Sequence, residues 1–219
     1  MKSRLVNFIL DLIYPPKCVF CGAVLEKSDI CHECEVTLPY TKGDSIYQKF
    51  PFVKKCLSPL YYKDNVREAV LRFKFLNAPS YSRRFGAIMS DCAENNLDCG
   101  SIDMISCIPL SKKRLKNRGY NQSELLAREI SNKIGVPYVA LLKKTKHNTA
   151  QSTIKDPKQR AVNVIGAYSI SDAEAVKGKH ILLVDDVVTT GATLSECARM
   201  LKREGAETVY CITLARHED

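Results

Sequence analysis

Hydrophobic and polar residues follow two patterns that change near residue 58. Beyond that point, short runs rich in β-branched and aromatic residues alternate with amphipathic segments of helical period, which is typical of an α/β domain. The run at 180–184 is almost wholly apolar and predicts a strand buried on both faces of a parallel sheet. Strands are predicted at 59–62, 102–108, 180–184 and 208–214.

Amphipathic segments between these runs predict helices. In the first of them, Val66, Ala69, Val70 and Phe73 share one face. Glycine and proline end the later segments, as in Gly135-Val136-Pro137. The predicted helices span 65–75, 81–96, 122–134 and 194–203. The pattern therefore predicts a mainly parallel sheet flanked by helices, ending in a right-handed βαβ unit.

Residues 1–58 show little continuous periodicity and predict a separate small domain before a second one at 59–219. Asn7 and Asp11 interrupt the first apolar run, and Tyr14-Pro15-Pro16 stands where a secretion signal has small residues. We expect a retained amphipathic helix and a cytoplasmic protein. No apolar stretch approaches the roughly 18 residues that a membrane span needs.

Ten cysteines in a reducing compartment favour metal binding over disulfides. Cys18, Cys21, Cys31 and Cys34 form two CxxC pairs with the spacing of a tetrahedral zinc site, and four thiolates would make that zinc structural. An iron–sulfur cluster would accept the same ligands, and His32 could replace one thiolate. The other six cysteines show no comparable pairing.

Positive charge is concentrated in one part of the chain. The 33 Lys and Arg against 24 Asp and Glu give a net charge of +9. Residues 111–160 alone hold thirteen basic and three acidic residues, a balance of +10, which leaves −1 for the rest. Phosphates are the natural partners of such a segment, whether in a small molecule or in nucleic acid. A solvated basic surface is the alternative.

The stretch 181–193 carries the most specific chemistry. Asp185 and Asp186 come at the carboxyl end of the buried strand, where ligands of α/β sheets bind. Two carboxylates there can accept hydrogen bonds from vicinal sugar hydroxyls. The following loop leads into a helix and offers hydroxyls and backbone N–H groups to a phosphate, through Thr189, Thr190, Gly191, Ala192 and Thr193. The pattern suits a ribose 5-phosphate; an ordinary acidic turn is the alternative.

Two further segments complete the predicted site. The loop after the strand at 102–108 carries Lys112, Lys113, Arg114 and Arg118, and should face the same crevice, where it would bind pyrophosphate with Mg²⁺, or DNA. A solvated loop remains the alternative. The polar stretch 149–160 is either a lid or a plain surface excursion. Its candidate residues are Gln151 and Arg160.

The stretch 181–193 resembles, at every position, the signature of type I phosphoribosyltransferases. The whole chain resembles the ComF family of competence proteins, through Tyr14-Pro15-Pro16 before the cysteines, the run 118–122 (RGYNQ), and Gln151 to Arg160 followed by Asn163-Val164. This resemblance implies a type I phosphoribosyltransferase fold with an N-terminal four-cysteine zinc finger.

The same resemblance implies contacts and partners. Asp185 and Asp186 would bind the ribose of phosphoribosyl pyrophosphate (PRPP), and 189–193 its 5-phosphate. The family acts in natural transformation, on incoming single-stranded DNA in the cytoplasm, alongside other competence proteins. Catalytic residues are unknown, with the acidic pair as candidates. The acceptor of any transfer would meet a hood over the site, whose candidates are Tyr61, Tyr62, Arg67 and Lys74, and DNA bases could stack on Tyr120 and Tyr138.

Three functions follow. The first is transfer of a phosphoribosyl group from Mg-PRPP to an acceptor, including a small molecule. The second is recognition of a ribose phosphate or DNA without catalysis. The third is an assembly role in which the zinc unit docks another competence protein.

Overall fold

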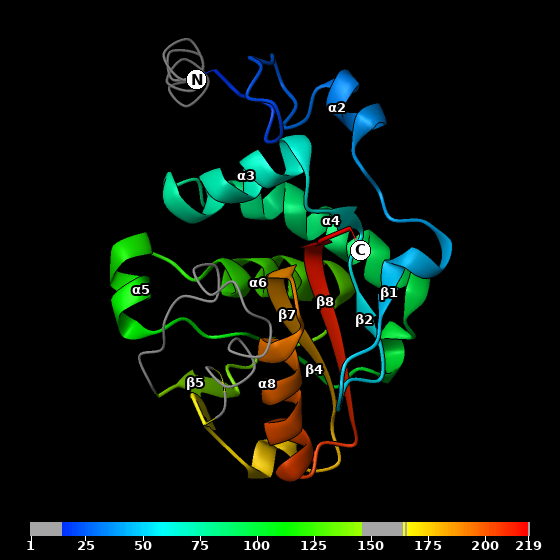
Figure 1. Ribbon diagram of the computed structural model, residues 1–219, viewed down its shortest axis with the longest axis vertical. Helices are drawn as coiled ribbons and strands as arrows, with labels where there is room; N and C mark the ends of the chain where they lie inside the picture. Colours follow the sequence, from blue (N-terminus) through cyan, green and yellow to red (C-terminus); the bar gives the residue numbers. More distant parts are fainter. Residues whose placement is uncertain (1–14, 146–163, 165, 219) are drawn as a thin grey trace, which may run out of the picture.

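A computed structural model describes residues 15–145, 164 and 166–218 (Figure 1). The expected N-terminal helix lies outside these residues, as do Gln151 and Arg160 of the candidate lid. The described helices include none that is both long and apolar enough to cross a membrane.

Six of the described strands form one sheet with a parallel centre. Its three central strands are β4 (Met104–Cys107), β7 (His180–Val188) and β8 (Thr208–Arg216), with β7 between the other two. On the far side of β8, two short strands pair with it in parallel, β2 (Cys56–Leu57) and β3 (Leu60–Tyr61). An antiparallel edge strand, β1 (Tyr47–Gln48), completes the sheet.

Helices cover both faces of this sheet (Figure 1). One face carries α3 (Asp64–Phe75), α4 (Tyr81–Asn96) and α6 (Gln122–Ile134), and the other carries α8 (Ala192–Arg203). Short helical turns elsewhere are α2 (His32–Thr37), η1 (Gly43–Ile46), η2 (Cys99–Ser101) and η4 (Glu174–Val176).

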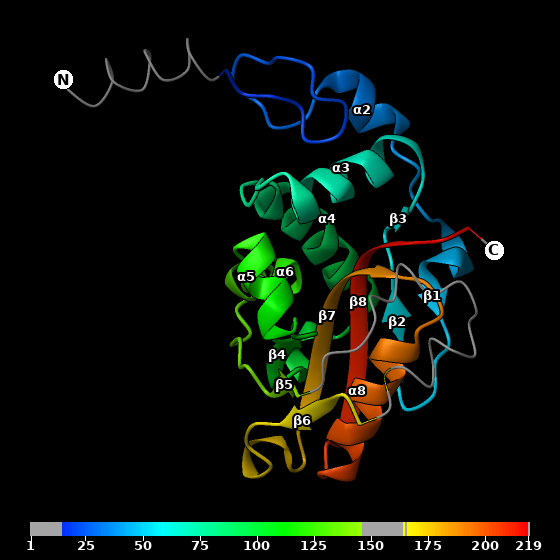
Figure 2. The same ribbon diagram turned by 60° about the vertical axis from the view of Figure 1, so that its left-hand side comes forward.

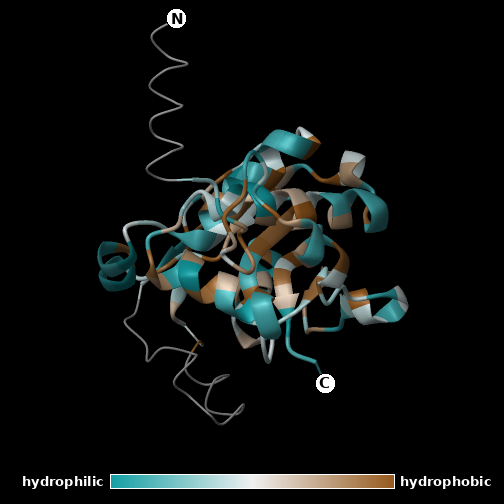
Figure 3. Ribbon diagram, turned by 90° about the horizontal axis from the view of Figure 1, so that it is seen from above, coloured by the Kyte–Doolittle hydropathy of each residue, from teal (hydrophilic) through white to brown (hydrophobic). Residues whose placement is uncertain are grey.

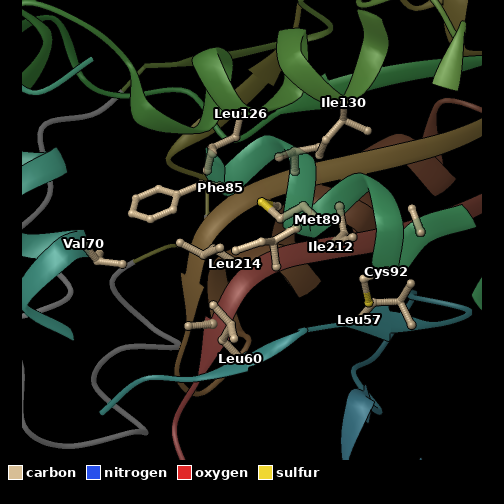
Figure 4. Packing of buried hydrophobic residues seen from close by; sticks show 14 of the residues in the cluster. Leu57, Leu60, Val70, Phe85, Met89, Cys92, Leu126, Ile130, Ile212 and Leu214 are labelled. Carbon is tan, nitrogen blue, oxygen red and sulfur yellow. The ribbon is translucent and has the colours of Figure 1, made fainter. Parts of the chain in front are cut away.

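The period of two along each strand divides the core into two clusters. Leu182 and Val184 of β7 pack with α4 and α6, whereas Ile181 and Leu183 pack with α8. Figure 4 shows the first cluster, in which side chains of α4 and α6 lie over Ile212 and Leu214 of β8. In Figure 3 the central strands are largely hydrophobic and hydrophilic residues gather on the outer helices.

The four predicted helices are confirmed with small changes in their ends. Two sequence-based expectations are wrong. The strand expected at 180–184 is present but ends at Val188 instead of Val184, so Asp185 and Asp186 lie within the strand and not after it. The basic loop expected after the strand at 102–108 is in fact largely a helix, α5 (Lys112–Arg118).

Local capping explains the helix α5. Ser111 Oγ accepts a hydrogen bond from the backbone N–H of Arg114 at its start, and Gly119 ends it with a left-handed φ of 79°. The sequence analysis also does not predict a small two-stranded antiparallel sheet. It consists of β5 (Leu142–Lys144) and β6 (Tyr168–Ile170).

The sheet includes residues from both sides of the domain boundary expected at residues 58 and 59. Cys56 and Leu57 pair with Cys211 and Ile212 in the centre of the fold. The N-terminal region thus contributes backbone hydrogen bonds to the main sheet.

Gly86 marks a close approach of α4 to α6. A Cβ at this position would lie 2.3 Å from Glu129 Cβ. Gly86→Ala should therefore lower the free energy of unfolding by about 1–3 kcal/mol, because two helix backbones must separate. Urea denaturation followed by circular dichroism measures this.

Gly100→Ala is the matched control, since its Cβ would come no closer than 3.4 Å to Asp98 Oδ1. It should change stability by less than about 1 kcal/mol. Equal effects of the two substitutions would contradict the proposed close approach of the helices.

Candidate functional site

A cavity of about 460 Å³ opens where β4 and β7 end. Its lining comes from segments far apart in sequence: α3, the residues after β4, α5, the paired strands β5 and β6, and the stretch 185–194. Carboxyl ends of neighbouring parallel strands meet at one edge of a sheet, which explains why these segments converge.

The acidic pair forms one wall of this cavity. Asp185 Oδ1 accepts hydrogen bonds from Ser123 Oγ at 2.7 Å and from the backbone N–H of Asp186 at 2.9 Å. Asp186 Oδ1 lies 2.8 Å from Lys74 Nζ in an ion pair whose two side chains are mostly buried. Burial, with the added negative charge of Asp186, raises the pKa of Asp185 to about 7. The carboxyl group of Asp185 therefore keeps its proton to a higher pH than an exposed aspartate does.

The threonine and glycine loop lies beside the acidic pair and leads into α8. Gly191 caps the helix with a left-handed φ of 70°, and a Cβ there would lie 2.2 Å from the Phe50 ring. Position 191 thus requires glycine, because the backbone is left-handed there and the Phe50 ring leaves no space for a Cβ. The first N–H groups of a helix have no intrahelical acceptor, so this loop and helix start suit an anion. All five predicted phosphate residues line the cavity, Thr189, Thr190, Gly191, Ala192 and Thr193.

The predicted basic residues divide into two groups. Arg114 and Arg118, four residues apart on α5, line the cavity, whereas Lys112 and Lys113 are exposed outside its lining. Lys144 of β5 also lines the cavity. Burial, together with the charge of Arg114, lowers the pKa of Lys144. Cations closely spaced around a cavity favour an anionic ligand.

The stretch 118–122 holds the cavity walls together. Arg118 Nη1 donates to Gln122 Oε1 at 2.9 Å, and Asn121 Nδ2 donates to the carbonyl of Ile108 at 3.0 Å. Tyr120 OH donates to the carbonyl of Phe73 at 2.5 Å, so this hydroxyl group is engaged by the protein. Tyr138, the other predicted stacking ring, is covered by Arg128, whose Cζ lies 4.5 Å from the ring centre.

Three of the four residues predicted for the hood line the cavity. Arg67 and Lys74 line the cavity from α3, where a spacing of seven residues places them on one face. Tyr62 lines it as well, and its ring lies 5.1 Å from that of His217, centre to centre. Tyr61 is absent from the lining.

Four polar residues of the lining were not predicted from the sequence: Ser123, Lys144, Tyr168 and His217. Lys144 lacks a sequence signal, since Leu142 is followed by two lysines and apolar and polar residues do not alternate there. Isolated polar residues such as Ser123 and His217 carry no such signal, because tertiary packing alone brings them to the site.

The four predicted metal ligands converge. The Sγ atoms of Cys18, Cys21, Cys31 and Cys34 all lie within 4.8 Å of one another, and among the described residues this is the one group of its kind. Backbone N–H groups of Cys31 and Cys34 point at sulfur atoms of the cluster at 3.4 Å. Four thiolates in this arrangement fit a closed tetrahedral zinc site. His32 does not belong to the group.

This zinc knuckle, residues 17–38, packs on α3 and α4. Arg72 Nη2 donates to the carbonyls of Val19 at 3.1 Å and Phe20 at 2.6 Å. The ring of Phe20 lies 5.7 Å from that of Phe85. Helix α3 therefore contacts the knuckle through Arg72 and the cavity through Lys74.

Two family models match the chain. The phosphoribosyl transferase domain matches residues 121–219, and the double zinc ribbon domain matches residues 9–45. Together with the mainly parallel α/β sheet and the four-cysteine cluster, these matches confirm the predicted type I phosphoribosyltransferase fold with an N-terminal zinc-binding unit.

Similar proteins include two competence proteins. Competence protein ComFC of Bacillus subtilis is 30% identical over 200 residues, covering 91% of this chain and 77% of the relative. Competence protein F of Haemophilus influenzae is 27% identical over 207 residues, covering 91% and 90%. The solved structure of glutamine PRPP amidotransferase from B. subtilis superposes on 65% of this chain at 20% identity with a TM-score of 0.45, and the chain spans 30% of it.

The raised pKa of Asp185 predicts a pH-dependent cost to stability. The folded chain holds this proton more tightly than the unfolded chain, so the group destabilises the fold increasingly from about pH 4 to about pH 7. Asp185→Asn removes that cost. It should raise the free energy of unfolding by about 1–3 kcal/mol at pH 8 and leave it nearly unchanged near pH 4. Thermal melts across this range measure the difference.

Asp103→Asn is the control of opposite sign. The backbone N–H of His180 and Lys179 lower the pKa of Asp103, so its contribution is favourable at neutral pH and is lost in acid. Its substitution should destabilise the protein at pH 8. A pH-independent effect of Asp185→Asn would contradict the assignment at Asp185.

The zinc knuckle predicts a metal-dependent region of the fold. Cys18→Ser should reduce bound zinc from about one ion per chain to nearly none and lower the thermal midpoint, because structural zinc contributes folding free energy. Elemental analysis and melting curves test both. Cys99→Ser is the control, since Cys99 lies outside the cluster. Wild-type protein that folds normally without zinc would contradict this role.

Proposed function

This chain belongs to the ComF family of competence proteins, and from that premise we propose that its cavity binds a ribose 5-phosphate, with PRPP as the first candidate. One observation carries the proposal: the acidic pair and the loop 189–193 line a single cavity together with basic side chains. A volume of about 460 Å³ is in the range of small-molecule sites.

Each part of such a ligand would face complementary residues of the cavity. Ribose hydroxyls donate to Asp185 and Asp186, and the 5-phosphate takes the start of α8. Pyrophosphate, arriving with Mg²⁺, faces Arg114, Arg118 and Lys144. Asp186 can keep its ion pair with Lys74 while it accepts a hydroxyl, because a carboxylate has about four lone-pair sites.

The same arrangement supports phosphoribosyl transfer. The bond from ribose C1 to pyrophosphate would break with its electron pair on the leaving oxygen, and the acceptor would form the new bond at C1. Positive charge develops on the ribose ring as that bond breaks, and the nearby carboxylates would stabilise it. The acceptor would enter beneath Tyr62, Arg67 and Lys74.

In the cell we place this chain in natural transformation, acting on single-stranded DNA in the cytoplasm with other competence proteins. Support comes from the relatives named competence protein F and ComFC, and from others named DNA utilization protein YhgH. The basic helix α5 adds the charge that DNA binding needs.

Two further functions share these features. A site that binds PRPP without releasing pyrophosphate would make the chain a recognition module. A role in assembly would place partner contacts on the zinc knuckle. Release of pyrophosphate in the presence of single-stranded DNA would distinguish transfer from recognition alone. A mutation in the zinc knuckle that abolishes partner binding and retains PRPP binding would identify the assembly role.

Calorimetric titration of Mg-PRPP into zinc-replete protein tests the ribose site. Asp185→Ala with Asp186→Ala should weaken binding by about 100-fold or more, since two charge-assisted hydrogen bonds of about 1.5–3 kcal/mol each are lost. The fold should remain, with a midpoint within a few degrees of wild type.

Asp91→Asn provides the matched control. Asp91 makes a surface ion pair with Lys133, remote from the cavity lining, and its loss should leave the PRPP affinity unchanged. Wild-type affinity in the double variant would refute the ribose assignment.

A further inference from the structure

We propose that Phe75, at the end of α3, is a stacking platform for one base of single-stranded DNA, and that α5 beside it holds the adjoining phosphates. The proposal rests on the DNA-handling part of the proposed function and extends it to a named surface. Tyr120 and Tyr138 are both less exposed than Phe75, which leaves Phe75 as the more accessible ring for a base.

The apolar component is a pair of consecutive exposed residues. Phe75 is 62% exposed and Leu76 is 68% exposed. The core face of α3 is already complete without them, since Val66, Ala69, Val70 and Phe73 are its buried residues. Two large apolar side chains in water at one helix end are costly to hydrate and fit a flat apolar ligand.

The charged component is α5. Five of its seven residues are Lys or Arg and none is acidic. Lys112, Lys113 and Lys116 are exposed. Such a short, uniformly cationic surface is complementary to a phosphate backbone.

Arg118 joins the two components. Its Cζ lies 4.9 Å from the centre of the Phe75 ring, within the range of a cation–π contact. Figures 1 and 2 show the end of α3 next to α5 in both views. This contact holds the ring in place while most of the residue remains accessible, so the platform is ordered before a base arrives.

The surface formed by Phe75 and α5 lies next to the cavity. Arg118 lines the cavity and also contacts Phe75. A nucleotide stacked on Phe75 would therefore lie at the cavity edge, with the strand passing over α5. Its neighbour along the strand would then be within reach of the site proposed for the ribose phosphate.

A single strand fits this surface better than other anionic partners. Only an unpaired strand repeats a free aromatic face and a phosphate at every nucleotide. Duplex DNA keeps its bases stacked inside the helix. An acidic peptide matches the cations of α5 and leaves Phe75 and Leu76 without a complementary planar group.

Fluorescence anisotropy with two probes separates stacking from charge. One probe is an oligothymidylate of roughly 15 nucleotides, and the other is an abasic oligomer of equal length. Phe75→Ala should weaken binding of the thymidylate about tenfold and change binding of the abasic oligomer less than about twofold. Phe75→Tyr, which keeps a stacking ring, should restore the thymidylate affinity.

Phe52→Ala is the matched control. Phe52 is 53% exposed. It lies between β1 and β2 in sequence, and these strands are at the opposite edge of the sheet from β4, the strand that precedes α5. Its loss should leave both affinities unchanged, and Mg-PRPP titration of Phe75→Ala should match wild type.

Other outcomes overturn the platform. Unchanged thymidylate binding by Phe75→Ala, or equal losses on both probes, would show that the ring does not stack a base. A competition experiment with an oligoglutamate tests the peptide alternative. If the oligoglutamate displaces the thymidylate, and Phe75→Ala weakens binding of both ligands to the same extent, the surface belongs to an acidic peptide. If wild type binds neither oligomer, the DNA-handling part of the proposed function fails as well, whereas PRPP titration tests the ribose site independently.

Discussion

Two adjacent carboxylates at the end of a strand buried on both faces impose the main constraint on this fold. Removing charge from water costs several kcal/mol per ion unless partners compensate it. Here the partners come from different elements: Ser123 from α6 and Lys74 from α3 reach Asp185 and Asp186. The helices on this face of the sheet must therefore keep their places relative to β7, and the core beneath them serves the site as much as it serves stability.

These partners lower the desolvation cost of the two carboxylates but do not remove it. The raised pKa of Asp185 means that its surroundings favour the protonated form more than water does. Perturbed pKa values of this kind are common in functional sites, where a ligand can supply further hydrogen bonds. A sugar that donates hydroxyl hydrogens would do so here.

Sequence patterns predicted the large elements because helices and buried strands carry clear periods. The helix α5 escaped prediction because its seven residues have no apolar face, and Ser111 and Gly119, the two caps, determine it. The acidic pair and the loop 189–193 were predicted because they are contiguous. Lys144, Tyr168 and His217 were missed because separate segments bring them to the cavity, and no local pattern records that encounter.

Helix α3 has a consequence for how this chain can evolve. Three neighbouring residues point in three directions: Arg72 to the zinc knuckle, Phe73 to the core and Lys74 to the acidic pair. Each residue advances a helix by about 100°. One inserted or deleted codon early in α3 would turn Arg72 and Lys74 away from their partners together, while the amino-acid composition stayed nearly the same. The length of this helix should thus be held more strictly among descendants than the identity of most of its residues.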